Sequence, residues 1–329
     1  ARNVVFQGFE DAMDTASREA RVCFIEGPQG VGKERLLRDL RTRAEDADVQ
    51  VARSGSGARS LGGLIPLIRA SYRAHDGDDP WILSRRQSLE RLLGEERTES
   101  AQEEDQPIDG TFIASLLAGV REPTLYLITD AQLLDPQSIE VLSDVCRLLT
   151  PLEALGEASF PPCFFAVTYI ADDSQTAQAL RALGEATRHV TLSGLEVDDV
   201  GQLVSDLLGR EALPAQEIID LHRVTDGIPA RIHEALFALK ESGDLRLERG
   251  DWVFRPTQPV PLPDSGSEIL RRRIAALSPD HRELVEKLCI HQDPIPLELA
   301  QGIAGQSDVV RELIARGILE RTRIEAESC

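Results

Sequence analysis

The sequence has few aromatic residues and a deficit of positive charge. Phe, Trp and Tyr make up 4% of its 329 residues, so its core must consist mainly of Leu, Ile, Val and Ala, which suits helix-rich α/β packing. Lys and Arg number 36 against 56 Asp and Glu, a net charge of −20. Such a charge repels nucleic acid and anionic membrane surfaces, although a local basic patch is compatible with it. Nucleic acid is therefore not an expected partner.

Paired cysteines and long apolar runs are also missing. The five cysteines form no C-x-x-C pair, and several stand in apolar runs; they are Cys23, Cys146, Cys163, Cys289 and Cys329. We expect reduced cysteines in the core of a cytoplasmic protein. No apolar run approaches the roughly 18 residues needed to cross a bilayer, and no signal peptide is visible. Because the chain starts at Ala1 and stops after an apparent strand, we expect a piece of a longer protein.

Apolar runs and helical patterns alternate in the first 194 residues. The expected strands are 21–26, 49–52, 124–129, 163–169 and 189–192. The expected helices are 33–44, 64–72, 81–93, 111–120 and 136–149, with an acidic surface loop at 94–109. Alternation of this kind predicts an α/β fold with a five-stranded parallel sheet.

The pattern changes after Gly194. Residues 196–241 show only helical periodicity, which is broken at 213–214 and at 226–229. Residues 245–254 predict a hairpin with Gly250 and Asp251 at its turn, and a proline-rich linker follows at 256–266. Short helices are expected at 268–277, 281–289, 296–303 and 309–316, and a strand at 317–320. We therefore predict three domains: a nucleotide-binding domain at 1–194, a helical lid at 195–245, and a linker with a winged helix at 246–329.

Residues 27–33 match the phosphate-binding motif G-x-x-x-x-G-K. They are Gly27, Pro28, Gln29, Gly30, Val31, Gly32 and Lys33. They lie between an expected strand and an expected helix, which is the setting that the motif requires. The glycines let the loop curl so that its amides converge on phosphate oxygens, and the positive end of the helix dipole points to the same place. Lys33 supplies an ammonium for the terminal phosphates of ATP or ADP.

Position 34 departs from that motif, which has Ser or Thr there to bind Mg²⁺. This chain has Glu34, a longer side chain whose charge would lie close to the phosphates. At about 5 Å and an effective dielectric constant of about 20, one like-charge pair costs about 3 kcal/mol. A bound cation would offset this cost, so a role for Mg²⁺ stays open although its usual ligands are substituted.

The order of these motifs resembles that of the STAND signalling ATPases, an AAA-related group that includes the maltose-regulon activator, and of ATPase regions attached to bacterial receptor kinases. Residues 6–10 stand where that family has an apolar-x-Gly-Arg-Glu segment. Residues 125–135 resemble its acidic strand motif, 164–173 its sensor strand, and 226–229 its Gly-x-Pro lid signature. The resemblance implies a P-loop ATPase with a helical lid and a winged helix.

Four positions depart from the family pattern. Phe9 replaces an arginine, Glu34 the metal-binding hydroxyl, and Ile170 the arginine that commonly follows the sensor strand. In register with Asp135, Thr129 falls on the metal-binding acid and Asp130 on the catalytic one. A slip of one residue would give Asp130 the metal role and put Ala131 on the catalytic position. In either register one acid is lost.

These losses predict a site that binds nucleotide and hydrolyses it poorly. Phosphoryl transfer depends on positioned charge and metal, and losing one such group costs roughly 3–4 kcal/mol. The leading hypothesis is a regulatory ATP- or ADP-binding switch or pseudo-ATPase module of a larger signalling protein. Its expected partners are other domains or proteins, with self-association left open. The alternatives are an active ATPase and a DNA-associated protein that uses its winged helix.

Two lid residues have two interpretations each. In the family, the lid proline packs near the nucleotide base, but Pro229 could equally be a helix breaker after Gly227. Arg231 could reach a phosphate, or it could be a solvated helix arginine.

Residues 271–273 are all arginine, yet 246–329 hold 12 Lys and Arg against 14 Asp and Glu. This balance is unlike that of most DNA-recognition modules, which are basic.

Overall fold

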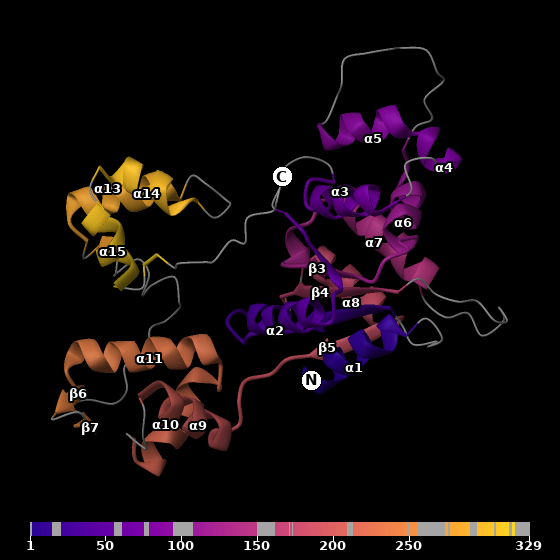
Figure 1. The fold of residues 1–329 in the computed structure, drawn as a ribbon. Helices are drawn as coiled ribbons and strands as arrows, with labels where there is room; N and C mark the ends of the chain where they lie inside the picture. The colour runs from indigo at the N-terminus through magenta and orange to yellow at the C-terminus, as the bar shows by residue number, and fades with distance from the viewer. Residues whose placement is uncertain are drawn as a thin grey trace. The chain divides into compact units, whose positions relative to one another are not determined.

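The computed structural model describes most of the chain. The described residues are 2–14, 21–55, 61–75, 79–94, 108–149, 162–170, 172, 174–208, 213–248, 251–255, 274–275, 277–289, 295–305, 307–315 and 318–319. The chain divides into two compact units, Ala1–Gly194 and Leu195–Cys329. Figure 1 shows their elements, and each unit is described by itself.

The first unit is built on a five-stranded parallel sheet. Its strands are β1 (Val22–Glu26), β2 (Gln50–Arg53), β3 (Thr124–Ile128), β4 (Cys163–Tyr169) and β5 (Arg188–Thr191). Their order is β2-β3-β4-β1-β5, and every neighbouring pair is parallel. The predicted α/β fold with a five-stranded parallel sheet is confirmed. All carboxyl ends meet at one edge, the place where open α/β sheets bind ligands.

Helices cover both faces of this sheet. They are α1 (Arg2–Met13), α2 (Lys33–Asp46), α3 (Ile65–Ala74), α4 (Pro80–Leu83), α5 (Arg86–Leu93), α6 (Gly110–Ala118), α7 (Pro136–Leu149) and α8 (Gln175–Glu185), with a 3₁₀ turn η1 (Ala131–Leu133). Alternate strand residues point to opposite layers. In β1, Cys23 and Ile25 pack with α1 and α2, whereas Val22 and Phe24 pack with the helices of the other face. Figure 1 shows α1 and α2 on one side of the strands and α6 and α7 on the other.

Two helices of this unit were not predicted, and one predicted helix is divided. The helix α1 buries Val5, Phe9 and Ala12, and α8 begins at Ser174, whose hydroxyl accepts a hydrogen bond from the Ala177 amide. The single helix predicted at 81–93 is wrong, because α4 ends at Leu83 and α5 starts at Arg86. The predicted acidic loop lies mostly outside the described residues.

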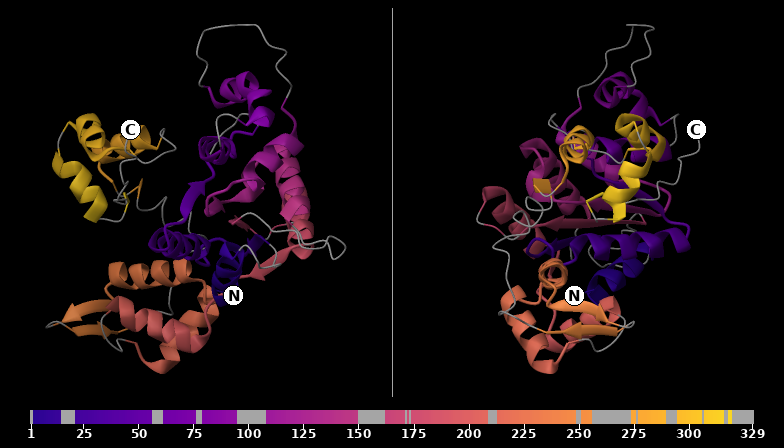
Figure 2. Two further views of the ribbon diagram at one scale, coloured as in Figure 1. Left: turned by 45° about the vertical axis from the view of Figure 1, so that its right-hand side comes forward. Right: turned by 90° about the vertical axis from the view of Figure 1, so that its left-hand side faces the viewer.

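The second unit begins with three helices and a hairpin. They are α9 (Val197–Leu208), α10 (Ala215–Thr225), α11 (Pro229–Ser242), β6 (Leu245–Glu248) and β7 (Asp251–Phe254). The helices and β6 share one apolar cluster, and the hairpin stands at the end of α11 in Figures 1 and 2. Asp251 pairs with Glu248 in the antiparallel ladder. Its predicted place in the turn is therefore wrong.

A separate apolar cluster contains α13 (Pro279–Leu288), α14 (Leu297–Ala304) and α15 (Ser307–Ala315). Ile318 and Leu319 pack against it, and both donate backbone hydrogen bonds to the Leu313 carbonyl, at 3.0 and 3.2 Å. These two residues do not form the predicted strand; the rest of 317–320 and the linker at 256–266 lie outside the described residues. The winged helix stays a prediction. No helix of the described part of the chain is long and apolar enough to cross a membrane.

Candidate functional site

The loop between β1 and α2 lies at the carboxyl edge of the sheet. It starts at Gly27, directly after β1, and α2 begins at Lys33. Gly30 and Gly32 have φ angles of 79° and 108°, in the left-handed region that glycine adopts at little cost. An α-helix leaves its first N–H groups without partners inside the helix. The curled backbone and the first N–H groups of α2 therefore form the kind of anion-binding site that the motif suggests.

Lys33 is folded back onto this loop. Its ammonium donates hydrogen bonds to the Gly27 carbonyl at 2.7 Å and to the Pro28 carbonyl at 2.9 Å. Only 8% of the residue is exposed, and this burial lowers the pKa of its ammonium, while the carboxylates of Asp130 and Glu34 act in the opposite direction. The loop thus holds one buried cation beside the place where phosphates would bind.

Glu34 occupies the first turn of α2 and is exposed. A carboxylate in the first turn interacts favourably with the positive end of the helix dipole. That same location brings it close to any phosphate held by the loop, where like charges repel. Glu34 therefore stabilises the start of the helix and at the same time opposes an anionic ligand.

The end of β3 supplies the second part of the site. Asp130 has a φ of 48°, an uncommon left-handed conformation for a residue with a side chain. Its Oδ1 accepts a hydrogen bond from the Gln132 amide at 3.2 Å, and its charge acts on the Lys33 ammonium. The Thr129 amide donates to the Ser54 hydroxyl at 3.0 Å, which fixes the end of β3 against β2. Of the two candidates for the acid position, Asp130 carries a carboxylate that acts on Lys33, whereas Ala131 is fully buried; the catalytic role of Asp130 stays a prediction.

Two of the substituted family positions have packing or backbone roles in this chain. Phe9 is 2% exposed and meets the Phe164 ring edge-on, with 6.1 Å between the ring centroids. Its apolar surroundings explain why an arginine would not fit there in this fold. Ile170 follows β4, and its amide donates to the Gln132 side-chain oxygen at 3.1 Å.

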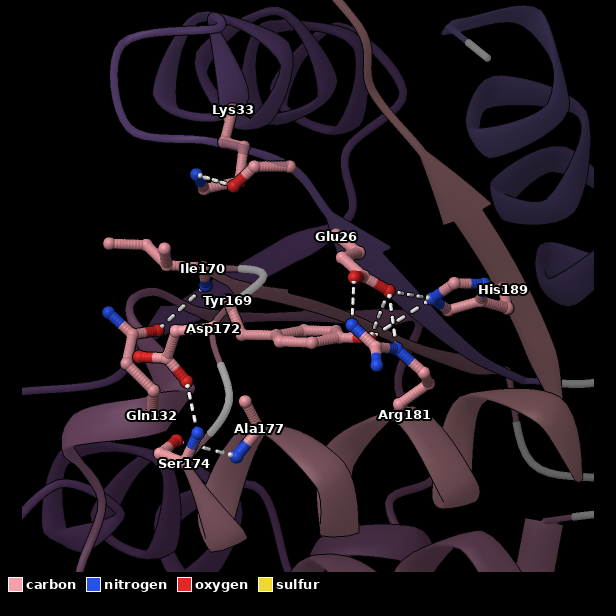
Figure 3. Close-up of polar contacts among 11 residues, drawn as sticks. Glu26, Lys33, Gln132, Tyr169, Ile170, Asp172, Ser174, Ala177, Arg181 and His189 are labelled. Atoms are coloured by element: carbon pink, nitrogen blue, oxygen red, sulfur yellow. Dashed lines mark hydrogen bonds and ion pairs between the residues drawn. The ribbon is translucent and has the colours of Figure 1, made fainter.

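A partly buried polar cluster at the end of β1, next to the loop, was not predicted. Glu26, the last residue of β1, accepts hydrogen bonds from the Tyr169 hydroxyl at 2.8 Å and from Arg181 at 2.5 and 3.2 Å. His189 Nε2 lies 3.0 Å from the Glu26 carboxylate and 3.0 Å from the Tyr169 hydroxyl. Figure 3 shows these four side chains converging from β1, β4, α8 and β5. The sequence signal was a glutamate ending an otherwise apolar strand.

The Glu26 cluster is strongly coupled electrostatically. Hydrogen bonding by Arg181 lowers the pKa of Glu26 against the effect of burial. Burial and the adjacent carboxylate raise the pKa of Tyr169 far above its ordinary value. The cluster therefore holds an ionised Glu26 directly before Gly27. It also connects the start of the loop to β4, α8 and β5.

Removing Arg181 tests this cluster. Arg181→Ala is expected to lower the free energy of unfolding only modestly at pH 7, because 41% of the Arg181 side chain is exposed and solvent screens the pair. Since the folded-state pKa of Glu26 is depressed, the contribution of the pair is present above the ordinary pKa of 4.5 and is lost as pH falls. Urea unfolding between pH 7 and pH 3 checks this. The exposed pair of Arg147 and Asp144 provides the control Arg147→Ala; a loss independent of pH in Arg181→Ala would contradict the coupling.

The two lid residues belong to the second unit. Pro229 is the first residue of α11, a position that favours proline, and α10 already ends at Thr225. Arg231 forms an ion pair with Asp226 at 2.8 Å, and 51% of its side chain is exposed. The structure places neither residue relative to the phosphate loop, so their nucleotide-binding roles stay predictions.

Comparison with known proteins gives structural matches only. No protein-family model and no curated protein matches the chain. The Thermotoga maritima RuvB Holliday junction branch migration motor matches with a TM-score of 0.36 and 12% identity, over 98% of this chain and 90% of that one. A structure of the E. coli MS115-1 HORMA:CdnC:Trip13 complex matches with a TM-score of 0.43 and 12% identity, over 84% of this chain and 87% of that one. With such low values, function has to be argued from the residues of this chain.

Proposed function

We propose that this chain is a regulatory nucleotide-binding module that binds ATP or ADP and hydrolyses ATP slowly or not at all. The observation that carries the proposal is the loop at 27–33, which holds the buried Lys33 ammonium at the start of α2 and at the carboxyl edge of a parallel sheet. A loop, a lysine and a helix start in this arrangement suit the phosphates of a nucleotide.

Slow hydrolysis is inferred from the groups around the loop. Glu34 stands where a metal-binding hydroxyl would be, and Thr129 leaves Asp130 as the acid at the end of β3. Ile170 brings no charge to the end of β4. Each missing stabiliser of the transition state costs roughly 10²–10³ in rate, so two losses would leave very little turnover.

Mg²⁺ binding is the property that Glu34 should change most. Glu34→Ser is expected to tighten the binding of Mg-nucleotide more than that of metal-free nucleotide, because it restores a metal ligand and removes a negative charge. Hydrolysis should recover only weakly while Thr129 remains. Isothermal titration with and without Mg²⁺ checks this, with Glu45→Ser at the other end of α2 as the control. Equal tightening in both conditions would mean that the charge alone matters.

A second candidate function is an active ATPase, and the position of Asp130 favours it. Its carboxylate lies near enough to the Lys33 ammonium to affect the lysine pKa. An acid at this place could orient a water for attack on a terminal phosphate. Turnover near the lower range for ordinary enzymes, about 1 s⁻¹, would support this candidate against the first.

The partners that we propose are protein domains, in the same parent chain or in another protein. The net charge of −20 disfavours nucleic acid. We also propose a cytoplasmic location, supported by the buried thiols of Cys23, Cys146 and Cys163, which form no disulfide and suit a reducing compartment.

A further inference from the structure

Gln132 joins the ends of β3 and β4 beside the phosphate loop. It lies in the 3₁₀ turn η1, two residues after Asp130. Its side-chain nitrogen donates to Asp130 Oδ1 at 3.2 Å, and its side-chain oxygen accepts from the Ile170 amide at 3.1 Å. In Figure 3, Gln132 reaches the backbone nitrogen of Ile170 below Lys33. One carboxamide thus links two strand ends that lie next to each other in the sheet.

The chemistry of a carboxamide fits this position. It has two N–H donors and one oxygen acceptor, and Asp130 takes one of the two donors. Gln132 is only half-buried, so a ligand held by the loop can approach it. It is also neutral, and therefore adds no repulsion toward a phosphate.

Gln132 lies at the carboxyl ends of β3 and β4, the edge of the sheet that also carries the phosphate loop, and this favours the terminal phosphate over the nucleoside as its ligand. In loops of this type the lysine serves the terminal phosphates, and the carboxylate that acts on Lys33 is the one that Gln132 holds. A third phosphate arriving beside Lys33 would meet the negative charge of Asp130. An N–H donor on the Asp130 carboxylate reduces that repulsion and offers a second N–H to the phosphate.

We propose that Gln132 is a specificity-determining residue that favours nucleoside triphosphate over diphosphate in this chain. The inference rests on the proposed function, since it needs nucleotide in the loop. Gln132 supplies, from η1, the polar contact that Ile170 cannot supply from the end of β4. Because Gln132 bonds to Asp130 after β3 and to the Ile170 amide after β4, binding of the third phosphate also affects the backbone at the end of β4.

Paired affinities for ADP and a non-hydrolysable ATP analogue test this inference. Gln132→Leu keeps the size of the side chain and removes its hydrogen bonds. It should weaken binding of the analogue about tenfold or more, since a hydrogen bond to a charged group is worth about 1.5–3 kcal/mol, and leave ADP affinity within about twofold. Gln132→Asn, which keeps a shortened carboxamide, should lose less. Gln202→Leu is the matched control, because Gln202 donates an exposed hydrogen bond to Asp206 at 2.8 Å on α9.

The outcomes separate this inference from the proposed function. A wild-type chain that binds neither nucleotide would overturn both. If the wild-type chain binds both nucleotides and Gln132→Leu weakens them equally, or weakens neither, the inference is overturned and the proposed function stands. A selective loss of the ATP analogue in Gln132→Leu, smaller in Gln132→Asn and missing from Gln202→Leu, is the supporting result.

Discussion

Lys33→Ala should weaken the binding of both ATP and ADP by roughly 100-fold or more, because charge-assisted hydrogen bonds to phosphate are each worth about 1.5–3 kcal/mol. The lysine ammonium already lies against the loop through the carbonyls of Gly27 and Pro28. We expect rotation of the Lys33 side chain to redirect its ammonium to a bound phosphate. Isothermal titration of each nucleotide measures the change.

The matched control for this prediction is Arg38→Ala. Arg38 lies on the same helix α2, is exposed, and follows Lys33 by more than one turn. Its removal lowers the charge of α2 by the same amount and should change affinity less than threefold, given solvent screening. If both variants lose affinity equally, binding follows overall charge, and the loop is not the site.

Gly227→Ala should destabilise the second unit by about 3 kcal/mol or more. Gly227 has a φ of 65°, which is costly for any residue with a Cβ atom. A Cβ there would lie 2.8 Å from the Leu195 backbone nitrogen and would also clash with the Leu195 carbonyl oxygen. The Leu195 amide donates to the Gly227 carbonyl at 2.8 Å, so neither backbone segment can move away without breaking that bond.

A second glycine separates the steric effect from the backbone effect. Gly305 ends α14 with a φ of 67°, and a Cβ there would meet nothing within 4 Å. Gly305→Ala should therefore cost about 1 kcal/mol, the conformational part alone. Urea unfolding of both variants, followed by circular dichroism, gives the comparison. Equal losses in the two variants would show that the contact with Leu195 is not a constraint.

The sequence was sufficient to predict the sheet mainly because its three central strands, β3, β4 and β1, are buried on both faces. Strands of this kind appear as continuous apolar runs, and 163–169 was predicted with the bounds that β4 has. The helix α1 was not predicted, although Val5, Phe9 and Ala12 have helical spacing. The split between α4 and α5 depends on a local turn at Ser84, which periodicity does not reveal.

The candidate site likewise has one part that the sequence predicts and another part that only the fold brings together. The phosphate loop is a run of seven consecutive residues whose chemistry can be recognised without coordinates. The Glu26 cluster unites residues up to 163 positions apart, since it runs from Glu26 to His189, and only the sheet order β4-β1-β5 brings them together. The role proposed for Gln132 likewise depends on its hydrogen bond with Ile170, 38 positions away.

A single-turnover experiment tests the central claim most directly. The unmodified chain, in excess over ATP labelled at its γ-phosphate, is mixed with Mg²⁺, and both retained label and released phosphate are followed in time. Binding without chemistry would keep the label on the protein with little release over many minutes. Release at about 1 s⁻¹ or faster would contradict the account and identify an active ATPase, and failure to retain any label would contradict nucleotide binding itself.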